Sequence, residues 1–538
     1  MSAADILDRA RMGDVLTAYH MAKAAQQENP ADPNILLMRA VYASACGLRE
    51  DCIAVIDAVP DILSHPMAKM WGLNALVLNV DTDRLKKHGL VALPEDEAAL
   101  LALEPGLVLQ VAFGLHLLIA DPETDRDDLR HIAQLLLHYA IAKDAAHLAV
   151  LAGKAAIKLD GPEGVTEWRR STAPGHVVDP LLDMLLPECY RADPARHEPR
   201  MKAIAEQPAE SVFPVFGAVP RIGHRQPMPV AAVTSDDAMT PVIDAGRLAA
   251  SMRQVQAIVD TWLAGQGDWQ NWIAAVSNAG ASPLLVASTG RVGTMAIAGA
   301  LQQSGTLLPF HYLNNQPGIL EQNRLLYMLM TGTVPEEALI ALLQDWLRSR
   351  RAEIDFARFS GKRAVLVNHL DTVFAPVLLA CFPDSRVIYA ERDMRKTFLS
   401  LGYKNQFGYT QLRHLRYTLS SDANVFAGIR DEALSHDDEV VWYMAVTRAL
   451  IAAVCEVRGD DGVRTLDMEK IFAGEVGEQA AFRDAFGLND SDAGSVQSAF
   501  ADRVNEKAFF ALAPGIEDKV RDGLFEASWT RVTGLPLS

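Results

Sequence analysis

The sequence predicts a multidomain protein in which an N-terminal all-α helical-repeat domain precedes a C-terminal α/β domain with a central parallel sheet. At 538 residues, the chain is too long for a single hydrophobic core. Apolar residues recur at helical spacing over residues 1–204, whereas short apolar runs alternate with helical patterns after about residue 280. We therefore expect domains at 1–204 and 280–538, joined by a proline-rich linker and bridging helices over 205–279.

Charge and composition restrict the partners and the compartment. The formal net charge of −18 argues against general binding to nucleic acid or to acidic membranes, which repel an acidic protein. The N-terminus has acidic residues and lacks the apolar region of a signal peptide, and no uncharged run of 18 or more apolar residues occurs. The five cysteines are scattered without metal-ligand or disulfide spacing. We expect a cytoplasmic protein with no membrane span and no metal site.

The N-terminal domain is predicted from helical hairpins. Small and apolar residues recur at helical spacing between residues 18 and 61, and Pro30, Gly47 and Pro60 interrupt the helices. This pattern resembles a tetratricopeptide (TPR) repeat, and residues 131–159 have a similar character. No clean period of about 34 residues runs through the segment, so a plain helical bundle remains the alternative. Such a domain supplies a surface for a protein partner or for self-association.

Residues 205–245 are expected to form an extended linker, because recurring prolines break any helix there. Two helices are predicted after it, at 246–264 and 268–276. Their three tryptophans, Trp262, Trp269 and Trp272, suit a core between the domains.

The C-terminal domain is predicted from strands that alternate with helices, which indicates a parallel sheet with crossover connections. The predicted strands are residues 283–288, 363–369 and 386–391, and residues 306–313 are predicted to form a short strand or a loop. The predicted helices are residues 318–330, 335–351, 372–382 and 394–401. Because ligands bind outside the carboxyl ends of such strands, the residues at three strand ends draw attention: the turn at 289–294, His369 and Arg392.

The first strand leads into a glycine-bearing turn and then into a helix. The turn reads Thr289-Gly290-Arg291-Val292-Gly293-Thr294, and Met295 follows it. Glycine permits positive φ and close approach of a ligand, and the free N–H groups at a helix start attract an anion. Arg291 adds charged donors, so the turn predicts a phosphate-binding loop. It does not match the Walker pattern, which requires four residues between the glycines and a following lysine. An ordinary strand–turn–helix connection remains the alternative.

The strand ends resemble, in this order, those of sulfotransferases that use 3′-phosphoadenosine 5′-phosphosulfate (PAPS). In that family a basic-x-Gly-Thr-Thr turn holds the 5′-phosphosulfate, and residues 291–294 fit it, with Met295 in place of the second threonine. A later strand ends in an arginine, followed eight positions on by a helical serine, as Arg392 and Ser400 are here. The resemblance covers about residues 280–535, including a strand that leads to Glu469. Helical repeats in front of such a P-loop-like domain are typical of bacterial sulfotransferases.

The resemblance implies transfer of a sulfuryl group from PAPS to a hydroxyl or amine of a glycan, peptide or metabolite, with adenosine 3′,5′-bisphosphate as the product. It implies that Arg291 and the turn stabilise the departing 5′-phosphate, and that Arg392 and Ser400 hold the 3′-phosphate. Arg503 lies where the family returns a basic segment to the nucleotide.

Two positions are candidates for the general base that takes the proton of the acceptor. Many family members use a histidine at the strand end before the second motif, which corresponds to His369. Others use a glutamate beyond the first helix, where this chain has no glutamate and His311 is the nearest titratable residue. We predict His369 as the base and His311 as the second candidate. Either histidine is alternatively a partner in a buried hydrogen bond.

Other functions and roles stay open. Met295 and the choice between two bases keep a catalytically inactive nucleotide-binding scaffold as an alternative. A nucleotide kinase is disfavoured, because the Walker lysine is missing. Asp371 is a candidate for orienting the pocket, and Arg395 and Lys396 are candidates for strengthening the positive field around the nucleotide. No motif encodes the acceptor or the oligomeric state.

Overall fold

The chain divides into two compact units in the computed structural model, of which the first is Met1–Pro194 and the second contains most of the residues that follow. The structure describes residues 2–11, 15–45, 49–78, 81–119, 121–143, 145–172, 186–187, 189–191, 193–206, 243–302, 304–311, 316–405, 436–459, 462–489, 500 and 523–534.

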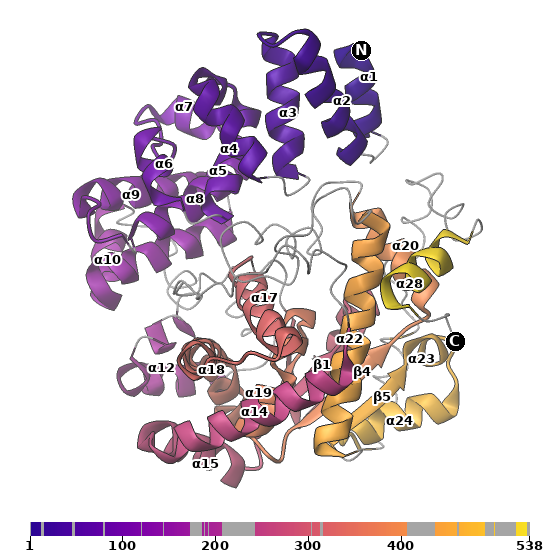
Figure 1. Cartoon of the computed structure of the whole chain (residues 1–538). Helices are drawn as coiled ribbons and strands as arrows, with labels where there is room; N and C mark the ends of the chain where they lie inside the picture. The colour runs from indigo at the N-terminus through magenta and orange to yellow at the C-terminus, as the bar shows by residue number, and fades with distance from the viewer. Residues whose placement is uncertain are drawn as a thin grey trace. The chain divides into compact units, whose positions relative to one another are not determined.

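The first unit is a succession of helices, as the sequence predicts, and most consecutive helices pack against each other (Figure 1). They are α1 (Ala3–Arg11), α2 (Val15–Glu28), α3 (Pro33–Ala45), α4 (Arg49–Ala58), η1 (Pro60–Ser64), α5 (Pro66–Leu78), α6 (Thr82–Lys87), α7 (Glu97–Leu101), α8 (Pro105–Ile119), α9 (Arg126–Ala142) and α10 (Ala146–Thr172).

Local sequence signals explain where these helices begin and end. α2 ends before Pro30 and α4 ends before Pro60, because proline lacks the N–H that a helix interior needs. The side chains of Asp81, Asp96 and Asp125 accept hydrogen bonds from N–H groups in the first turns of α6, α7 and α9. The helical character of the unit is confirmed, whereas its TPR-like character stays a prediction.

The second unit is built on a five-stranded sheet of β1 (Leu284–Ala287), β2 (Leu307–Phe310), β3 (Arg363–Leu366), β4 (Arg386–Glu391) and β5 (Val463–Asp467). The strand order is β2-β3-β1-β4-β5 and all pairs are parallel, which confirms the predicted sheet. β1 lies in the centre and is buried throughout, and Pro309 is tolerated because β2 is an edge strand. The chain moves from β1 to one side and later to the other, so the carboxyl end of β1 is a topological switch point.

The helices of the second unit surround this sheet (Figure 1). They are α12 (Pro194–Ala205), α14 (Ala245–Ala264), α15 (Gly267–Asn278), α16 (Thr294–Gln302), α17 (Gln316–Thr331), α18 (Glu336–Phe359), η4 (His369–Phe374), α19 (Ala375–Cys381), α20 (Met394–Asn405), α22 (His436–Arg458), α23 (Met468–Phe472), α24 (Val476–Phe486) and α28 (Leu524–Thr533).

The tryptophans of α14 and α15 belong to the core of the second unit. The Trp272 ring contacts Phe382 with ring centroids 5.6 Å apart, and Trp272 Nε1 donates hydrogen bonds to Asp355 on α18. Trp269 lies between Trp262 and Trp272. These partners are all in the second unit, and the expected role in a core between domains stays a prediction.

Two further predictions need correction at the end of β3. The predicted strand 363–369 ends at Leu366, so His369 begins the short helix η4 instead of ending a strand. The predicted helix 372–382 is divided between η4 and α19, whose first turn contains Pro376. The histidine is therefore carried by a 3-10 turn beyond the sheet.

Part of α22, Val440–Arg458, is long and apolar enough to cross a membrane, and it is the one such segment among the described residues. However, 67% of that window is buried inside the fold, where it packs against α14 and α28. A buried core helix meets the same criteria of length and composition, so the segment is weak evidence for a membrane span.

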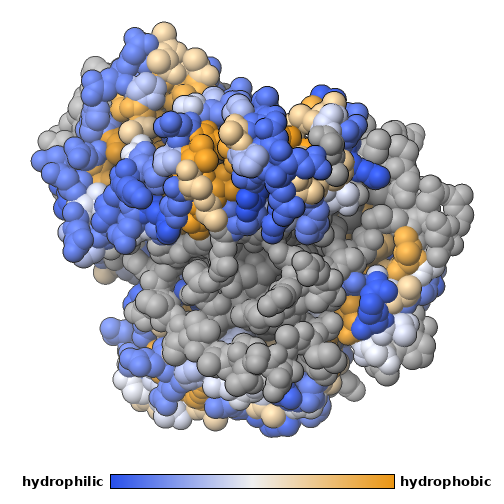
Figure 2. Space-filling model, turned by 45° about the horizontal axis from the view of Figure 1, so that its top comes forward, coloured by the Kyte–Doolittle hydropathy of each residue, from blue (hydrophilic) through white to orange (hydrophobic). Residues whose placement is uncertain are grey.

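Polar residues dominate the described surface in one view of the molecule. Figure 2 shows hydrophilic side chains over most of the coloured part of that face, with smaller groups of hydrophobic side chains between them. The large hydrophobic residues that are exposed in the described parts are dispersed along the chain: Met67, Ile141, Met295, Val476 and Leu524. Single exposed hydrophobic residues of this kind are normal on protein surfaces.

A buried ion pair fastens η4 to α18. Arg350 Nε donates a hydrogen bond of 3.3 Å to Asp371, and Arg350 Nη2 forms an ion pair with the same carboxylate. Trp346 Nε1 donates to Asp371 Oδ1 at 3.0 Å. On the other side, Thr372 Oγ1 donates to the carbonyl of Ser288 at the end of β1. The carboxylate of Asp371 faces α18 and, contrary to our expectation, does not orient the pocket directly. Its role is to hold the turn that carries His369.

We expect Asp371→Ala to lower the free energy of unfolding by about 3–5 kcal/mol, because the variant leaves the buried Arg350 without this counter-charge. Denaturant unfolding of the full chain, followed by tryptophan fluorescence, measures the loss. Arg348→Ala on α18, the helix that carries Arg350, is the control. Arg348 is exposed and pairs with Asp345 at 3.5 Å. Its expected cost is about 0–1 kcal/mol. Equal small losses in both variants would contradict the structural role of Asp371.

Candidate functional site

The turn between β1 and α16 has an unusual backbone. Gly290, Arg291 and Gly293 have φ angles of 78°, 61° and 100°, and Arg291 is the only non-glycine with positive φ in the described parts of the chain. A left-handed conformation costs a side-chain-bearing residue about 1–2 kcal/mol. A Cβ at Gly293 would lie 2.5 Å from Cζ of Phe472. The sequence therefore places glycine where the backbone requires it, and it accepts strain at Arg291, which is typical of functional turns.

The structure brings the two predicted phosphate-binding strand ends together. Arg291 Nε donates a hydrogen bond of 3.0 Å to Ser400 Oγ on α20. Arg392 Nη1 donates to the carbonyl oxygen of Arg291 at 3.4 Å. Because β1 and β4 are neighbours in the sheet, side chains about a hundred positions apart in sequence meet at one edge. Arg291 thus contacts both residues that the resemblance assigns to the 3′-phosphate, Arg392 and Ser400.

A carboxylate joins this basic cluster from β5 and α23. Glu469 accepts from Arg392 Nε at 2.7 Å and from Lys396 Nζ at 2.6 Å. Burial raises the pKa of Glu469, but the hydrogen bonds and charges of Arg392 and Lys396 outweigh it, so the pKa lies below its usual value of 4.5. Glu469 is therefore ionised at neutral pH. Arg395 is turned to Glu526 on α28, so of the two additional basic residues only Lys396 lies in the cluster.

The two predicted histidines contact the turn at different points. His311 follows β2, and its Nε2 hydrogen-bonds with Thr294 Oγ1 at 3.1 Å. His369 lies beside the first glycine, since a Cβ at Gly290 would be 3.4 Å from Cγ of its ring. Both histidines therefore border the predicted phosphate loop.

The remaining predicted site residues have different surroundings. The hydroxyl of Thr289 donates to the carbonyl of Gly290 at 3.1 Å. Val292 is buried in the core, so only its backbone can face a ligand. Met295 is 55% exposed in the first turn of α16. Arg503 lies outside the described residues.

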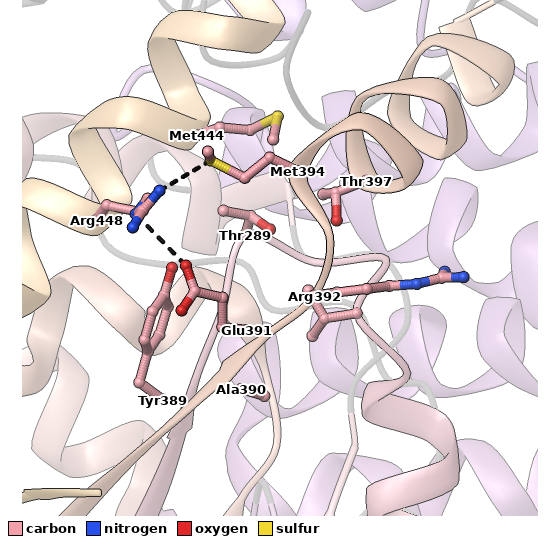
Figure 3. A pocket seen from close by; sticks show the side chains of 10 residues that line it. Thr289, Tyr389, Ala390, Glu391, Arg392, Met394, Thr397, Met444 and Arg448 are labelled. Carbon is pink, nitrogen blue, oxygen red and sulfur yellow. Dashed lines mark hydrogen bonds and ion pairs between the residues drawn. The ribbon is translucent and has the colours of Figure 1, made fainter. Parts of the chain in front are cut away.

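A small pocket borders the turn and the end of β4 (Figure 3). Arg448 Nε pairs with Glu391 Oε1 at 3.4 Å at one side of it. The guanidinium of Arg392 points away from this pair. Burial raises the pKa of Tyr389, so its phenol stays protonated at neutral pH. The lining residues are Thr289, Val292, Tyr389, Ala390, Glu391, Arg392, Met394, Thr397, Met444 and Arg448.

The sequence interpretation missed the contribution of α22 to this pocket. Met444 and Arg448 come from a helix that reads as an apolar core element. The one available signal is an arginine in the middle of an apolar helical run, which usually indicates a paired or functional charge.

In the described residues, no group of three or more histidine, cysteine or acidic side chains is arranged to hold a metal ion.

Comparison with known proteins gives one family match. Residues 283–423 match the family model described as a sulfotransferase domain. The matched part contains the glycine turn, both histidines and the pair Arg392 and Ser400. No curated protein and no solved structure matches the chain. The match supports a sulfotransferase domain over these residues and, with it, sulfuryl transfer as the general chemistry.

We expect Gly293→Ala to lower the free energy of unfolding by about 1–3 kcal/mol, because a side chain at this φ is strained and its Cβ overlaps Phe472. Gly299→Ala in α16 is the matched control, since its Cβ meets nothing within 4 Å. Alanine suits a helix interior better than glycine, so this variant should gain about 0.5–1 kcal/mol. Thermal unfolding measures both changes, and equal stability of the two variants would refute the requirement for glycine at 293.

Proposed function

We propose that this protein is a sulfotransferase that transfers the sulfuryl group of PAPS to a hydroxyl or amine of a glycan, peptide or metabolite. The contact between the two basic strand ends carries the proposal: 3.0 Å from Arg291 to Ser400 and 3.4 Å from Arg392 to the carbonyl of Arg291. Two phosphate-binding elements that meet at the carboxyl ends of neighbouring strands suit a single ligand with two phosphate groups. The sulfotransferase-domain match over residues 283–423 supports the same chemistry.

The residues present fit such a nucleotide. Gly290 and Gly293 let a phosphate approach the backbone, and the start of α16 offers N–H groups to the 5′-phosphosulfate. Arg392 offers a guanidinium fork to the 3′-phosphate. The hydroxyl of Ser400 accepts from Arg291 and keeps its own proton to donate. The donor set is cationic and hydroxylic, as recognition of a bisphosphorylated nucleotide requires.

The turn has a second role during transfer. PAPS supplies a sulfuryl group on an activated phosphate; the acceptor atom bonds to sulfur as the bond from sulfur to the 5′-phosphate oxygen breaks. Arg291 and the N–H groups of the turn stabilise the negative charge that develops on that oxygen. His369 takes the proton of the acceptor, and His311, held by Thr294, is the alternative base.

The proposal extends to the helical domain, the compartment and the type of relative. We propose that the helical domain, residues 1–204, is a TPR-like repeat that binds a protein partner or a second copy of the chain. We propose the cytoplasm as the compartment and a bacterial type of sulfotransferase as the relative. A scaffold that binds nucleotide without transferring sulfate is the alternative, since Met295 departs from the family turn.

Arg392→Ala should weaken binding of adenosine 3′,5′-bisphosphate by about 10- to 100-fold, because it removes charge-assisted hydrogen bonds to the 3′-phosphate. Isothermal titration calorimetry measures the change. Arg395→Ala is the control, because Arg395 lies three positions away on α20 and its half-exposed side chain pairs with Glu526. It should alter the affinity by no more than about twofold. A wild-type preference for ATP with magnesium over the bisphosphate would count against the proposal.

His369→Ala should lower the rate of transfer by about 10²- to 10⁴-fold, which is the usual effect of losing a general base, while nucleotide affinity stays near that of the wild type. Transfer of labelled sulfate from PAPS to acceptors in a cell extract measures the rate, with His311→Ala alongside. Full activity in His369→Ala together with loss in His311→Ala would assign the base to His311. A wild type that binds the bisphosphate but transfers nothing would favour the scaffold.

A further inference from the structure

Glu469 joins two cations of the candidate nucleotide site. Its Oε1 accepts from Arg392 Nε at 2.7 Å and its Oε2 accepts from Lys396 Nζ at 2.6 Å, so one carboxylate spans both side chains. The carboxylate is 29% exposed and Arg392 is 23% exposed, so the pair is partly shielded from solvent. Exposed ion pairs contribute little, whereas partly buried charge-assisted contacts hold their geometry.

Rigid elements determine where this carboxylate lies. β5 pairs with β4 in parallel, with Asp467 opposite Glu391. Arg392 follows β4 by one residue, and Glu469 lies two residues beyond Asp467. Asp467 also caps α23 by accepting from the N–H groups of Glu469 and Lys470. The position of Glu469 is therefore fixed by a strand register and a helix cap.

The contacts leave Arg392 able to bind a ligand. A guanidinium has five N–H donors, of which Glu469 takes one at Nε and the carbonyl of Arg291 takes one at Nη1. These two anchors fix the plane of the guanidinium, while its remaining donors are available to a phosphate. Lys396, in the first turn of α20, is held beside it by the other carboxylate oxygen.

We propose that Glu469 is a positioning residue that orients Arg392 and Lys396, and thereby makes the site select nucleotides with a phosphate on the 3′ position of the ribose. This inference rests on the proposed function, because it concerns the same nucleotide site. Without Glu469, two long flexible side chains lose their common anchor and have to be ordered when the nucleotide binds.

Simple Coulomb attraction predicts the opposite effect, namely that removal of Glu469 strengthens nucleotide binding. Removing a carboxylate next to two cations makes the site more positive, and a more positive site attracts a dianion more strongly. A loss of affinity in a variant without this charge therefore reports positioning, whereas a gain reports net charge alone.

The test compares Glu469→Gln with Glu526→Gln in the full-length protein. Both substitutions remove one negative charge from an ion pair with a basic residue of α20, and the Arg395–Glu526 pair has the same contact distance of 2.6 Å as the Lys396–Glu469 pair. The probes are adenosine 3′,5′-bisphosphate and adenosine 5′-phosphate, whose affinities are measured by calorimetry. Thermal unfolding shows whether each variant is folded at the temperature of the titration.

Glu469→Gln should weaken binding of the bisphosphate by about tenfold and of the 5′-phosphate by no more than about twofold, the size expected for one charge-assisted hydrogen bond at the 3′-phosphate. Glu526→Gln should leave both affinities within about twofold. In an Arg392→Ala background, Glu469→Gln should add less than about twofold, because residues that act through one contact are not additive.

Three results would overturn the inference: an unchanged or higher affinity of Glu469→Gln for the bisphosphate, an equal loss for both nucleotides, or a full additional loss in the Arg392→Ala background. Failure of the proposed function has a different signature. In that case the wild type itself would not prefer the bisphosphate over the 5′-phosphate, and the inference would fall with it.

Discussion

The site depends on holding three cations together at the ends of two neighbouring strands. Arg291, Arg392 and Lys396 repel one another, and the chain nevertheless keeps them within one hydrogen-bonded cluster. Two features make this possible: the parallel pairing of β1 with β4, which brings the strand ends together, and the carboxylate of Glu469, which offsets part of the charge. A cluster that remains positive after this compensation is suited to a ligand with several negative charges.

The surrounding fold keeps the cluster in register. Gly293 allows the turn to lie against Phe472, and the buried pair of Arg350 and Asp371 holds η4, with His369, against the end of β1. The positive φ of Arg291 is maintained by these neighbours and by its contact with Ser400. These contacts stabilise a strained turn, and backbone strain of this kind is common at binding sites.

The sequence predicted the parts of this arrangement that local patterns encode. The parallel sheet follows from apolar runs that alternate with helices, and the turn at 289–294 follows from its glycines and the helix after it. Contacts between distant residues were not predictable in the same way. Asp371 faces α18, and Arg448 reaches the pocket from α22, because three-dimensional packing and not local spacing selects such partners. The apolar run places His369 at a strand end, and only the structure shows that the strand stops at Leu366.

The most direct test of the account is a crystal structure of the protein with adenosine 3′,5′-bisphosphate bound. We expect the 3′-phosphate within hydrogen-bond distance of Arg392 and Ser400, and the 5′-phosphate on the N–H groups of the turn from Arg291 to Thr294. Glu469 should still contact Arg392 Nε in that complex. A nucleotide bound elsewhere, or phosphates that contact neither strand end, would contradict the claim that these two ends form one site.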